Sequence, residues 1–202
     1  MKTNNILDVA KVTLNKIQLV FPNAIVAGGL LRDTVLDKHV SDIDIFIKLD
    51  DYESASSAEG RLAKLIPSLG VSSIVGDTDG DSYGYSYDSE YISEVYEYTV
   101  SGHKIQVIML RGINPIEYVA DEFNCNLSKI WSQGIDELEK DMCMSPEFRM
   151  GKAMGILMFN SGTPKSYMNK ISKKYHEYDI CFNNLDDLVG TLAFRESEGG
   201  IL

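Results

Sequence analysis

Cysteine is scarce in this chain. The three cysteines, Cys125, Cys143 and Cys181, are odd in number and lack the close spacing of a zinc knuckle. This pattern excludes a disulfide-stapled secreted scaffold, because such domains carry paired cysteines at high density. We therefore expect free thiols in a reducing compartment.

Long apolar runs are also missing. No stretch approaches the roughly 20 apolar residues that a membrane-spanning helix needs. Residues 1–20 lack the uninterrupted apolar core and small-residue cleavage site of a signal peptide. We expect a cytoplasmic protein that has no membrane partner.

Positive charge is in short supply over most of the chain. Lys and Arg number 19 against 30 Asp and Glu, a formal charge of -11, which argues against an extensive nucleic-acid surface. The exception runs from Arg149 to His176, with six Lys or Arg and no acidic residue. That segment is a candidate binding region for a polyanion such as a triphosphate, and a solvated helix face is the alternative.

Periodicity predicts an α+β order of elements. Apolar residues recur at helical spacing over 6–20, a short apolar strand follows at 24–27, and a helix is expected over 30–36 after a Gly-Gly turn. Residues 41–49 alternate as a strand, with Asp42 and Asp44 on one face. Beyond them we expect a helix over 53–66, a Gly-, Ser- and Asp-rich loop over 75–90, a hairpin over 93–110 turning at Ser101–Gly102, a helix and a strand over 115–130, and mainly helices thereafter.

The two aspartates carry the strongest chemical signal. Carboxylates two residues apart on one strand face lie roughly 7 Å apart at their Cα atoms and repel each other unless a cation lies between them. Oxygen ligands of this kind suit Mg²⁺ or Mn²⁺. Upstream, Gly28–Gly29 lets the backbone approach a phosphate closely. The sequence therefore predicts that a metal and a phosphate meet at this place.

The order of these motifs resembles the DNA polymerase beta-like nucleotidyltransferases, and within them the poly(A) polymerase and CCA-adding branch. The matching residues are Gly28-Gly29-Leu30-Leu31-Arg32-Asp33 and then Asp42-Ile43-Asp44. The resemblance implies a nucleotidyltransferase head over residues 1–140, with a mixed or antiparallel sheet flanked by helices. A small helical C-terminal segment would follow over residues 141–202.

Two later stretches extend the resemblance, which covers roughly residues 20–158. Glu122 to Leu127 places Asn126 where the family's Asn approaches the nucleotide sugar, and Phe148 to Ala153 is similar to a triphosphate-binding helix. The resemblance thus implies Asp42 and Asp44 as catalytic metal ligands, and it implies nucleotide binding by Gly28, Gly29, Arg32, Asp33, Asn126, Arg149 and Lys152. Structural readings stay open: a surface ion pair for Arg32 and Asp33, and a turn cap for Asn126.

The chain also departs from the family pattern. Gln106 stands in the apparent slot of a further carboxylate, and an amide is a poor Mg²⁺ ligand. Glu97, Asp121 or Glu122 could compensate, or Gln106 could be plain strand polarity. We find no base-selecting Glu-Asp-x-x-Arg helix, and too few residues follow 158 for tRNA-holding domains. We therefore do not expect tRNA repair.

The predicted function is metal-dependent transfer of a nucleoside monophosphate from an NTP to an acceptor hydroxyl, with release of pyrophosphate. The acceptor is left open between an RNA 3′ end and another molecule. One alternative is a catalytically weakened relative that binds nucleotide or a protein partner. A second is an unrelated Asp-x-Asp enzyme, a sugar-nucleotide transferase or a phosphatase, against which the Gly-Gly element argues.

Overall fold

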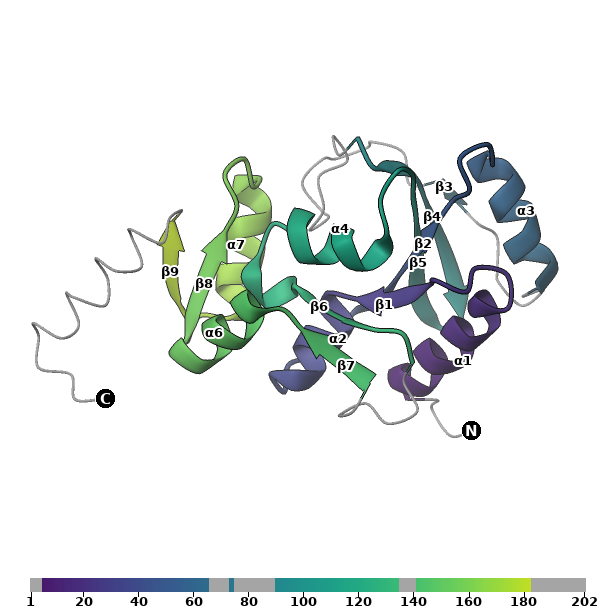
Figure 1. Ribbon diagram of the computed structural model, residues 1–202. Helices are drawn as coiled ribbons and strands as arrows, with labels where there is room; N and C mark the ends of the chain where they lie inside the picture. Colours follow the sequence, from purple (N-terminus) through teal and green to yellow (C-terminus); the bar gives the residue numbers. More distant parts are fainter. Residues whose placement is uncertain (1–4, 66–72, 75–89, 135–140, 183–202) are drawn as a thin grey trace, which may run out of the picture.

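The computed structural model describes residues 5–65, 73–74, 90–134 and 141–182. Within these ranges a central sheet carries helices on both faces, and a smaller C-terminal unit packs at one end (Figure 1). No helix among the described residues is both long enough and apolar enough to cross a membrane. The loop predicted over 75–90 lies almost wholly outside these residues.

The sheet has seven strands in the order β3-β4-β5-β2-β1-β6-β7. Strand β2 pairs in parallel with β5 along its whole length, whereas the other pairings are antiparallel, so the sheet is mixed as predicted. The strands are β1 (Ile25–Ala27), β2 (Asp42–Lys48), β3 (Ser73–Ile74), β4 (Ile92–Val100), β5 (His103–Leu110), β6 (Ile130–Ser132) and β7 (Met142–Met144).

Alternation along β2 assigns its side chains to two different cores. Ile43, Ile45 and Ile47 are fully buried in the larger cluster, which is covered by the helices α1 (Ile6–Gln18), α2 (Gly29–Val35) and α3 (Ala55–Leu65). Phe46 faces the opposite way and packs with the helix α4 (Pro115–Glu122). Asp42 and Asp44 share the face of Phe46, as the strand pattern predicted, and α4 lies on that side of the sheet in Figure 1.

Local signals explain where several helices begin. The Asn5 side chain accepts a hydrogen bond from the Leu7 N–H and caps α1. Asn114 and Glu117 form a capping box at α4, with Pro115 at the first helical position. The hairpin β4–β5 turns at Ser101 and Gly102, both with positive φ. The sequence predicted each of these elements.

The C-terminal unit is not purely helical. It contains α6 (Pro146–Met154), β8 (Ile156–Phe159), α7 (Lys165–Lys174) and β9 (Asp179–Phe182), and β8 pairs in parallel with β9. The prediction of a mainly helical segment missed this small sheet, because its strands have only four residues each and show no alternation of buried and exposed positions. The boundary at residue 140 stays a prediction; β7, just after it, still pairs with β6 of the main sheet.

Asn126 connects this unit to the main sheet. It lies in a short 3₁₀ turn, η1 (Asn126–Ser128), and its side chain is only 3% exposed. Its Nδ2 donates to the Ile156 carbonyl oxygen at 3.1 Å, and its Oδ1 accepts from the Met158 N–H at 2.9 Å. One side chain thus forms two hydrogen bonds to the β8 backbone.

Candidate nucleotide-binding site

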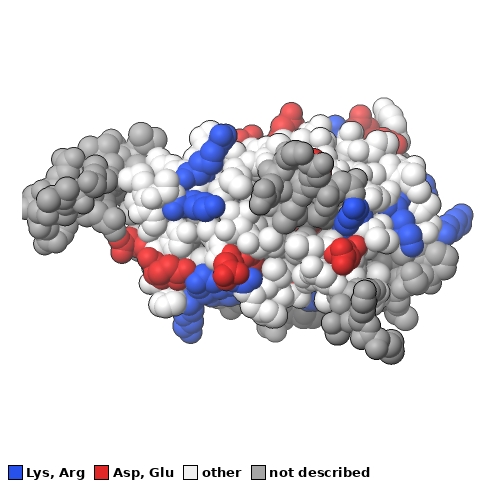
Figure 2. Space-filling model, turned by 90° about the horizontal axis from the view of Figure 1, so that it is seen from below, with Lys and Arg blue, Asp and Glu red and all other residues white. Residues whose placement is uncertain are grey.

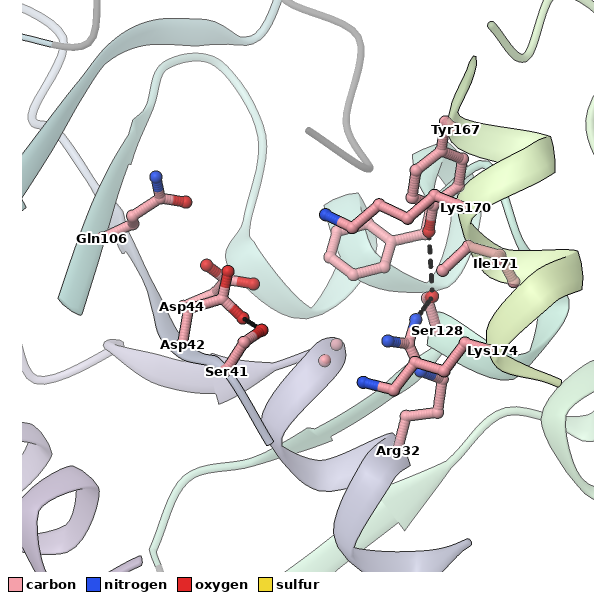
Figure 3. A pocket seen from close by; sticks show the side chains of 13 residues that line it. Arg32, Ser41, Asp42, Asp44, Gln106, Ser128, Tyr167, Lys170, Ile171 and Lys174 are labelled. Carbon is pink, nitrogen blue, oxygen red and sulfur yellow. Dashed lines mark hydrogen bonds between the residues drawn. The ribbon is translucent and has the colours of Figure 1, made fainter. Parts of the chain in front are cut away.

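One pocket gathers most of the residues that the sequence singled out. It lies between the start of β2, the start of α2 and one face of α7, and Figure 3 shows the carboxylates on one side of it and the cationic side chains on the other. The lining residues are Gly28, Gly29, Arg32, Ser41, Asp42, Asp44, Gln106, Phe123, Ser128, Tyr167, Lys170, Ile171 and Lys174.

Gly28 and Gly29 line the pocket between β1 and α2. Gly28 has a φ of 71°, which disfavours any residue with a Cβ, and a Cβ there would lie 3.1 Å from the Phe123 ring. A Cβ on Gly29 would come within 3.7 Å of both Arg32 and Asp42. The absence of both side chains therefore keeps the space between the cation and the carboxylate open.

Asp42 and Asp44, the first and third residues of β2, line the pocket. Asp42 accepts a hydrogen bond from the Ser41 hydroxyl at 2.8 Å, whereas Oδ1 of Asp44 is buried and has no hydrogen-bond partner in the part of the chain that the structure describes. Burial and the neighbouring charge of Asp42 raise the pKa of Asp44 to about 8, against the opposing effect of nearby cations. A divalent cation would supply the partner that this oxygen lacks, so the pair fits a metal ion.

Gln106 lies directly beside Asp44 on β5, in register across the parallel pair. Its side chain is 1% exposed and lines the pocket, and its Nε2 lies 3.4 Å from a Glu97 carboxylate oxygen. Glu97 also forms an ion pair of 2.7 Å with Lys104 and does not line the pocket. Asp121 and Glu122 are exposed at the end of α4. Among the described residues, therefore, no cluster of three His, Cys, Asp or Glu side chains forms a metal site.

Arg32 is a buried cation held on several sides. Its Nε lies 2.8 Å from Oδ1 of Asp33 and 2.7 Å from the Tyr175 hydroxyl, and its NH1 group donates to Ser128 Oγ at 2.8 Å. Its guanidinium also stacks over the Tyr175 ring at 5.2 Å. The Arg32–Asp33 pair is therefore a buried network and not a surface ion pair.

Asp33 does not line the pocket. Its side chain is 2% exposed and accepts hydrogen bonds from Arg32, from the Lys174 ammonium and from the Tyr175 hydroxyl. Although burial alone would raise the pKa of Asp33, the Arg32 charge and these hydrogen bonds hold that pKa below its usual value. The structure thus places Asp33 behind the pocket, where it contacts two residues that face the pocket.

Helix α7 supplies a side of the pocket that the sequence analysis did not identify. Lys170 and Lys174, one turn apart, line it together with Tyr167 and Ile171. Their only sequence signal was the excess of Lys and Arg between residues 149 and 176. The polyanion hypothesis for that segment named Arg149 and Lys152, but these side chains do not line the pocket.

The remaining predicted contacts lie elsewhere. Arg149 borders a separate hollow next to Trp131 and β7, and Lys152 is exposed on α6. Asn126 is occupied by the β8 backbone and does not line the pocket. Among the described residues on the face seen in Figure 2, basic and acidic side chains are interspersed. Nucleotide binding by Asn126, Arg149 and Lys152 stays a prediction.

Comparison with known proteins agrees with this fold. No family model matches the chain, and no curated protein sequence matches it. Among solved structures, the Thermotoga maritima CCA-adding enzyme in complex with tRNA is similar at a TM-score of 0.53 and 13% identity, covering 96% of this chain and 44% of that one. Two further CCA-adding enzyme structures, in complex with ATP and with CTP, are 12% identical, with TM-scores of 0.53 and 0.51.

These structures define the fold of the chain. The ATP and CTP complexes are covered over 42% and 44% of their length, so the chain spans less than half of the enzymes that it resembles. The described residues share an α+β fold with these CCA-adding enzymes, as the motifs predicted.

Proposed function

We propose that the chain is a metal-dependent nucleotidyltransferase that transfers a nucleoside monophosphate from an NTP to an acceptor hydroxyl and releases pyrophosphate. The observation that carries this proposal is the pocket itself. It places the Gly-Gly element and two carboxylates opposite three cationic side chains, Arg32, Lys170 and Lys174. The fold shared with CCA-adding enzymes in complex with ATP and CTP supports an NTP as the donor.

Asp42 and Asp44 would hold Mg²⁺ or Mn²⁺. The buried Oδ1 of Asp44 has no hydrogen-bond partner among the described residues, and burial, together with the charge of Asp42, raises the pKa of that carboxyl group. A divalent ion bound there would neutralise phosphate charge and favour the ionised form of an attacking hydroxyl.

The other pocket residues would bind and orient the triphosphate. Gly28 and Gly29 carry no side chain and would let its oxygens approach the backbone at the start of α2, and Arg32 offers a guanidinium that is already fixed. During transfer, the acceptor oxygen bonds to the α-phosphorus, the bond from that phosphorus to the bridging oxygen breaks, and the hydroxyl proton passes to water. Lys170 and Lys174 would stabilise the charge that accumulates on the departing pyrophosphate.

An RNA 3′ end is the acceptor to test first. The Thermotoga maritima enzyme with the same fold is complexed with tRNA, which supports an RNA hydroxyl for this chain. The formal charge of -11 favours an acceptor held over a short length, because extended backbone contact needs clustered Lys and Arg.

Labelled NTPs provide the direct test. The protein is incubated with each α-labelled NTP, Mg²⁺ or Mn²⁺, and total RNA or a small-molecule extract, and labelled products are separated. We expect label in RNA with the wild type and none with Asp42→Asn/Asp44→Asn. Label only in the small-molecule fraction would replace RNA as the acceptor, and a wild type that binds no NTP would refute the proposal.

Gln106 motivates a second candidate function. An amide stands beside Asp44 where the family pattern has a carboxylate. The second candidate is therefore a protein with the nucleotidyltransferase fold that binds an NTP but transfers its nucleoside monophosphate slowly. The variant Gln106→Asp separates the two functions. A large gain of transfer over a nearly inactive wild type supports the weakened relative, whereas little change from an active wild type supports the enzyme.

A further inference from the structure

Three donors from two helices converge on the buried carboxylate of Asp33. The donors are the Arg32 Nε–H on α2, the Lys174 ammonium near the end of α7 and the Tyr175 hydroxyl just after that end. With its side chain 2% exposed, the carboxylate exchanges almost all of its water contacts for these groups. Asp33 is thus the shared partner through which α2 and α7 are connected.

Two of these partners, Arg32 and Lys174, face the pocket, whereas Asp33 does not. Figure 3 shows both cationic groups at the same end of the pocket, close to the start of α2. Arg32 is only 7% exposed in its side chain and Lys174 26%. Two cations so far removed from water repel each other unless an anion lies between them.

The other contacts of Arg32 and Lys174 orient these side chains but do not neutralise their positive charge. Ser128 and the Tyr175 ring hold Arg32 from the sides, and the His39 carbonyl oxygen accepts from Lys174 at 2.8 Å. None of these groups is an anion, so Asp33 supplies the only full negative charge in direct contact with either side chain among the contacts described. The lowered pKa of Asp33 keeps that charge in place well below neutral pH.

We propose that Asp33 is a positioning residue of the nucleotide site, which holds Arg32 and Lys174 at one end of the pocket so that helix α7 contributes a phosphate-binding cation. This inference rests on the proposed function, since it assigns the phosphates to that end of the pocket. It also gives Asp33 a different role from the direct nucleotide contact that the motif implied.

A simpler role for Asp33 would have the opposite effect on binding. If its charge only neutralised the two cations, removing that charge would leave the pocket more positive and would strengthen phosphate binding. If it positions them, Asp33→Asn sets an amide N–H₂ or a neutral oxygen against the ammonium, and Lys174 moves away from the phosphates. The sign of the change therefore distinguishes the two roles.

The test measures binding of inorganic tripolyphosphate with Mg²⁺, and of adenosine, by calorimetry on the full chain. For Asp33→Asn we expect tripolyphosphate affinity to fall about tenfold, the range lost with one charge-assisted hydrogen bond, and adenosine affinity to stay the same. Asp33→Glu, which keeps the charge but displaces the carboxylate by a methylene, should also lose affinity. Equal or tighter tripolyphosphate binding by Asp33→Asn, or wild-type binding by Asp33→Glu, would overturn the proposal.

A second variant tests the proposal if Asp33→Asn does not fold. Tyr175→Phe keeps the ring over Arg32 but removes the hydroxyl, which donates to Asp33 and accepts from the Arg32 Nε–H at 2.7 Å, and it leaves every pocket-lining side chain in place. Its tripolyphosphate affinity should fall severalfold, and an unchanged affinity would overturn the proposal.

A ligand-free measurement separates this proposal from the proposed function. In the wild type, the Arg32 Nε–H resonance, assigned with Arg32→Lys, should exchange slowly with water, and in Asp33→Asn it should exchange fast. Fast exchange in both proteins would overturn the positioning role. Slow exchange in a wild type that binds no tripolyphosphate and no NTP would refute the nucleotide site that the proposal needs.

Discussion

Two features of the Asp44 site disfavour its ionised form when no cation is bound. Its Oδ1 is buried without a hydrogen-bond partner among the residues that the structure describes, and the carboxylate of Asp42 projects from the same strand face two residues away. Both features favour the protonated form, which explains why the pKa of Asp44 rises to about 8. The same features that favour a divalent ion therefore make the metal-free site sensitive to pH.

The first prediction concerns the stability of the metal-free protein. Because the folded pKa of Asp44 lies above the unfolded value near 3.8, the folded state binds the extra proton between those values. The stabilisation is fully present below about pH 4 and is lost as the pH rises through about 8. In EDTA, thermal unfolding of the wild type should therefore show a lower midpoint at pH 8.5 than at pH 6.

Asp44→Asn is the control for this prediction. Its side chain does not titrate, so its midpoint should change less over the same pH range. Each 1 kcal/mol of difference corresponds to about 2–4 °C in a chain of this size. Parallel curves for the two proteins would show that Asp44 is already ionised in the folded state.

Asn126 and Gly151 provide a second prediction at the scale of single residues. A Cβ on Gly151 would lie 2.1 Å from Asn126 Nδ2 and 2.8 Å from the Ile156 carbonyl oxygen, so Gly151→Ala must displace the side chain that binds β8. We expect a loss of about 1–3 kcal/mol in the free energy of unfolding, measured with urea. Gly60→Ala on α3 is the matched control, because a Cβ there meets nothing within 4 Å and should stabilise the helix slightly. Similar losses in both variants would contradict the role of Asn126.

Among the elements, α7 carries the third prediction. Lys170 and Lys174 face the pocket on the same side as the buried Tyr167 and Ile171, whereas Lys173 is exposed and does not line the pocket. Lys170→Met should weaken ATP binding about 10–100-fold, the range for one hydrogen bond to a charged group, and should leave adenosine binding unchanged.

Lys173→Met removes the same charge from the same helix and is the control for this measurement. Its ATP affinity should stay close to that of the wild type. Equal losses in the two variants would mean that α7 acts through its overall charge and not through the side chains that face the pocket.

Elements differ in how well the sequence predicted them, for physical reasons. The alternation along β2 fixes the face of both aspartates, because a strand has a period of two and one face is apolar. The basic segment from Arg149 to His176 gave no comparable prediction of which side chains face the pocket. The basic residues of α6 and those of α7 belong to the same Lys- and Arg-rich segment, and its composition does not distinguish them. The packing of Tyr167 and Ile171 against the core decides which basic side chains reach the pocket.

For the molecule as a whole, metal binding should increase stability. A ligand that binds only the folded state stabilises it by about 2.7 kcal/mol at 100 times its dissociation constant. Millimolar Mg²⁺ or Mn²⁺ should therefore raise the unfolding midpoint of the wild type at pH 7.5, and Asp42→Asn/Asp44→Asn should remove the increase. An increase of the same size in the double variant would place the metal elsewhere.

The head fold was predictable from the motifs because they combine local geometry with chemistry. Gly28, Gly29 and the two aspartates line the pocket and lie close together in the sequence, so a short pattern describes them. The contacts of Arg32 and Asp33 with residues 174 and 175 depend on how distant segments pack, and no local pattern encodes them. Likewise, Asn126 matched a family position, but its hydrogen bonds to β8 emerge only in three dimensions.

The link between Asp33 and Lys174 spans 141 positions of the chain. Contacts between such distant residues form late, since the long intervening segment must first be ordered. A nascent polypeptide leaving the ribosome therefore exposes its two aspartates long before the lysines of α7 have been translated. Premature termination or proteolytic clipping ahead of α7 would leave the pocket without Lys170 and Lys174, so under the proposed function we expect nucleotide transfer to await synthesis of the polypeptide through that helix.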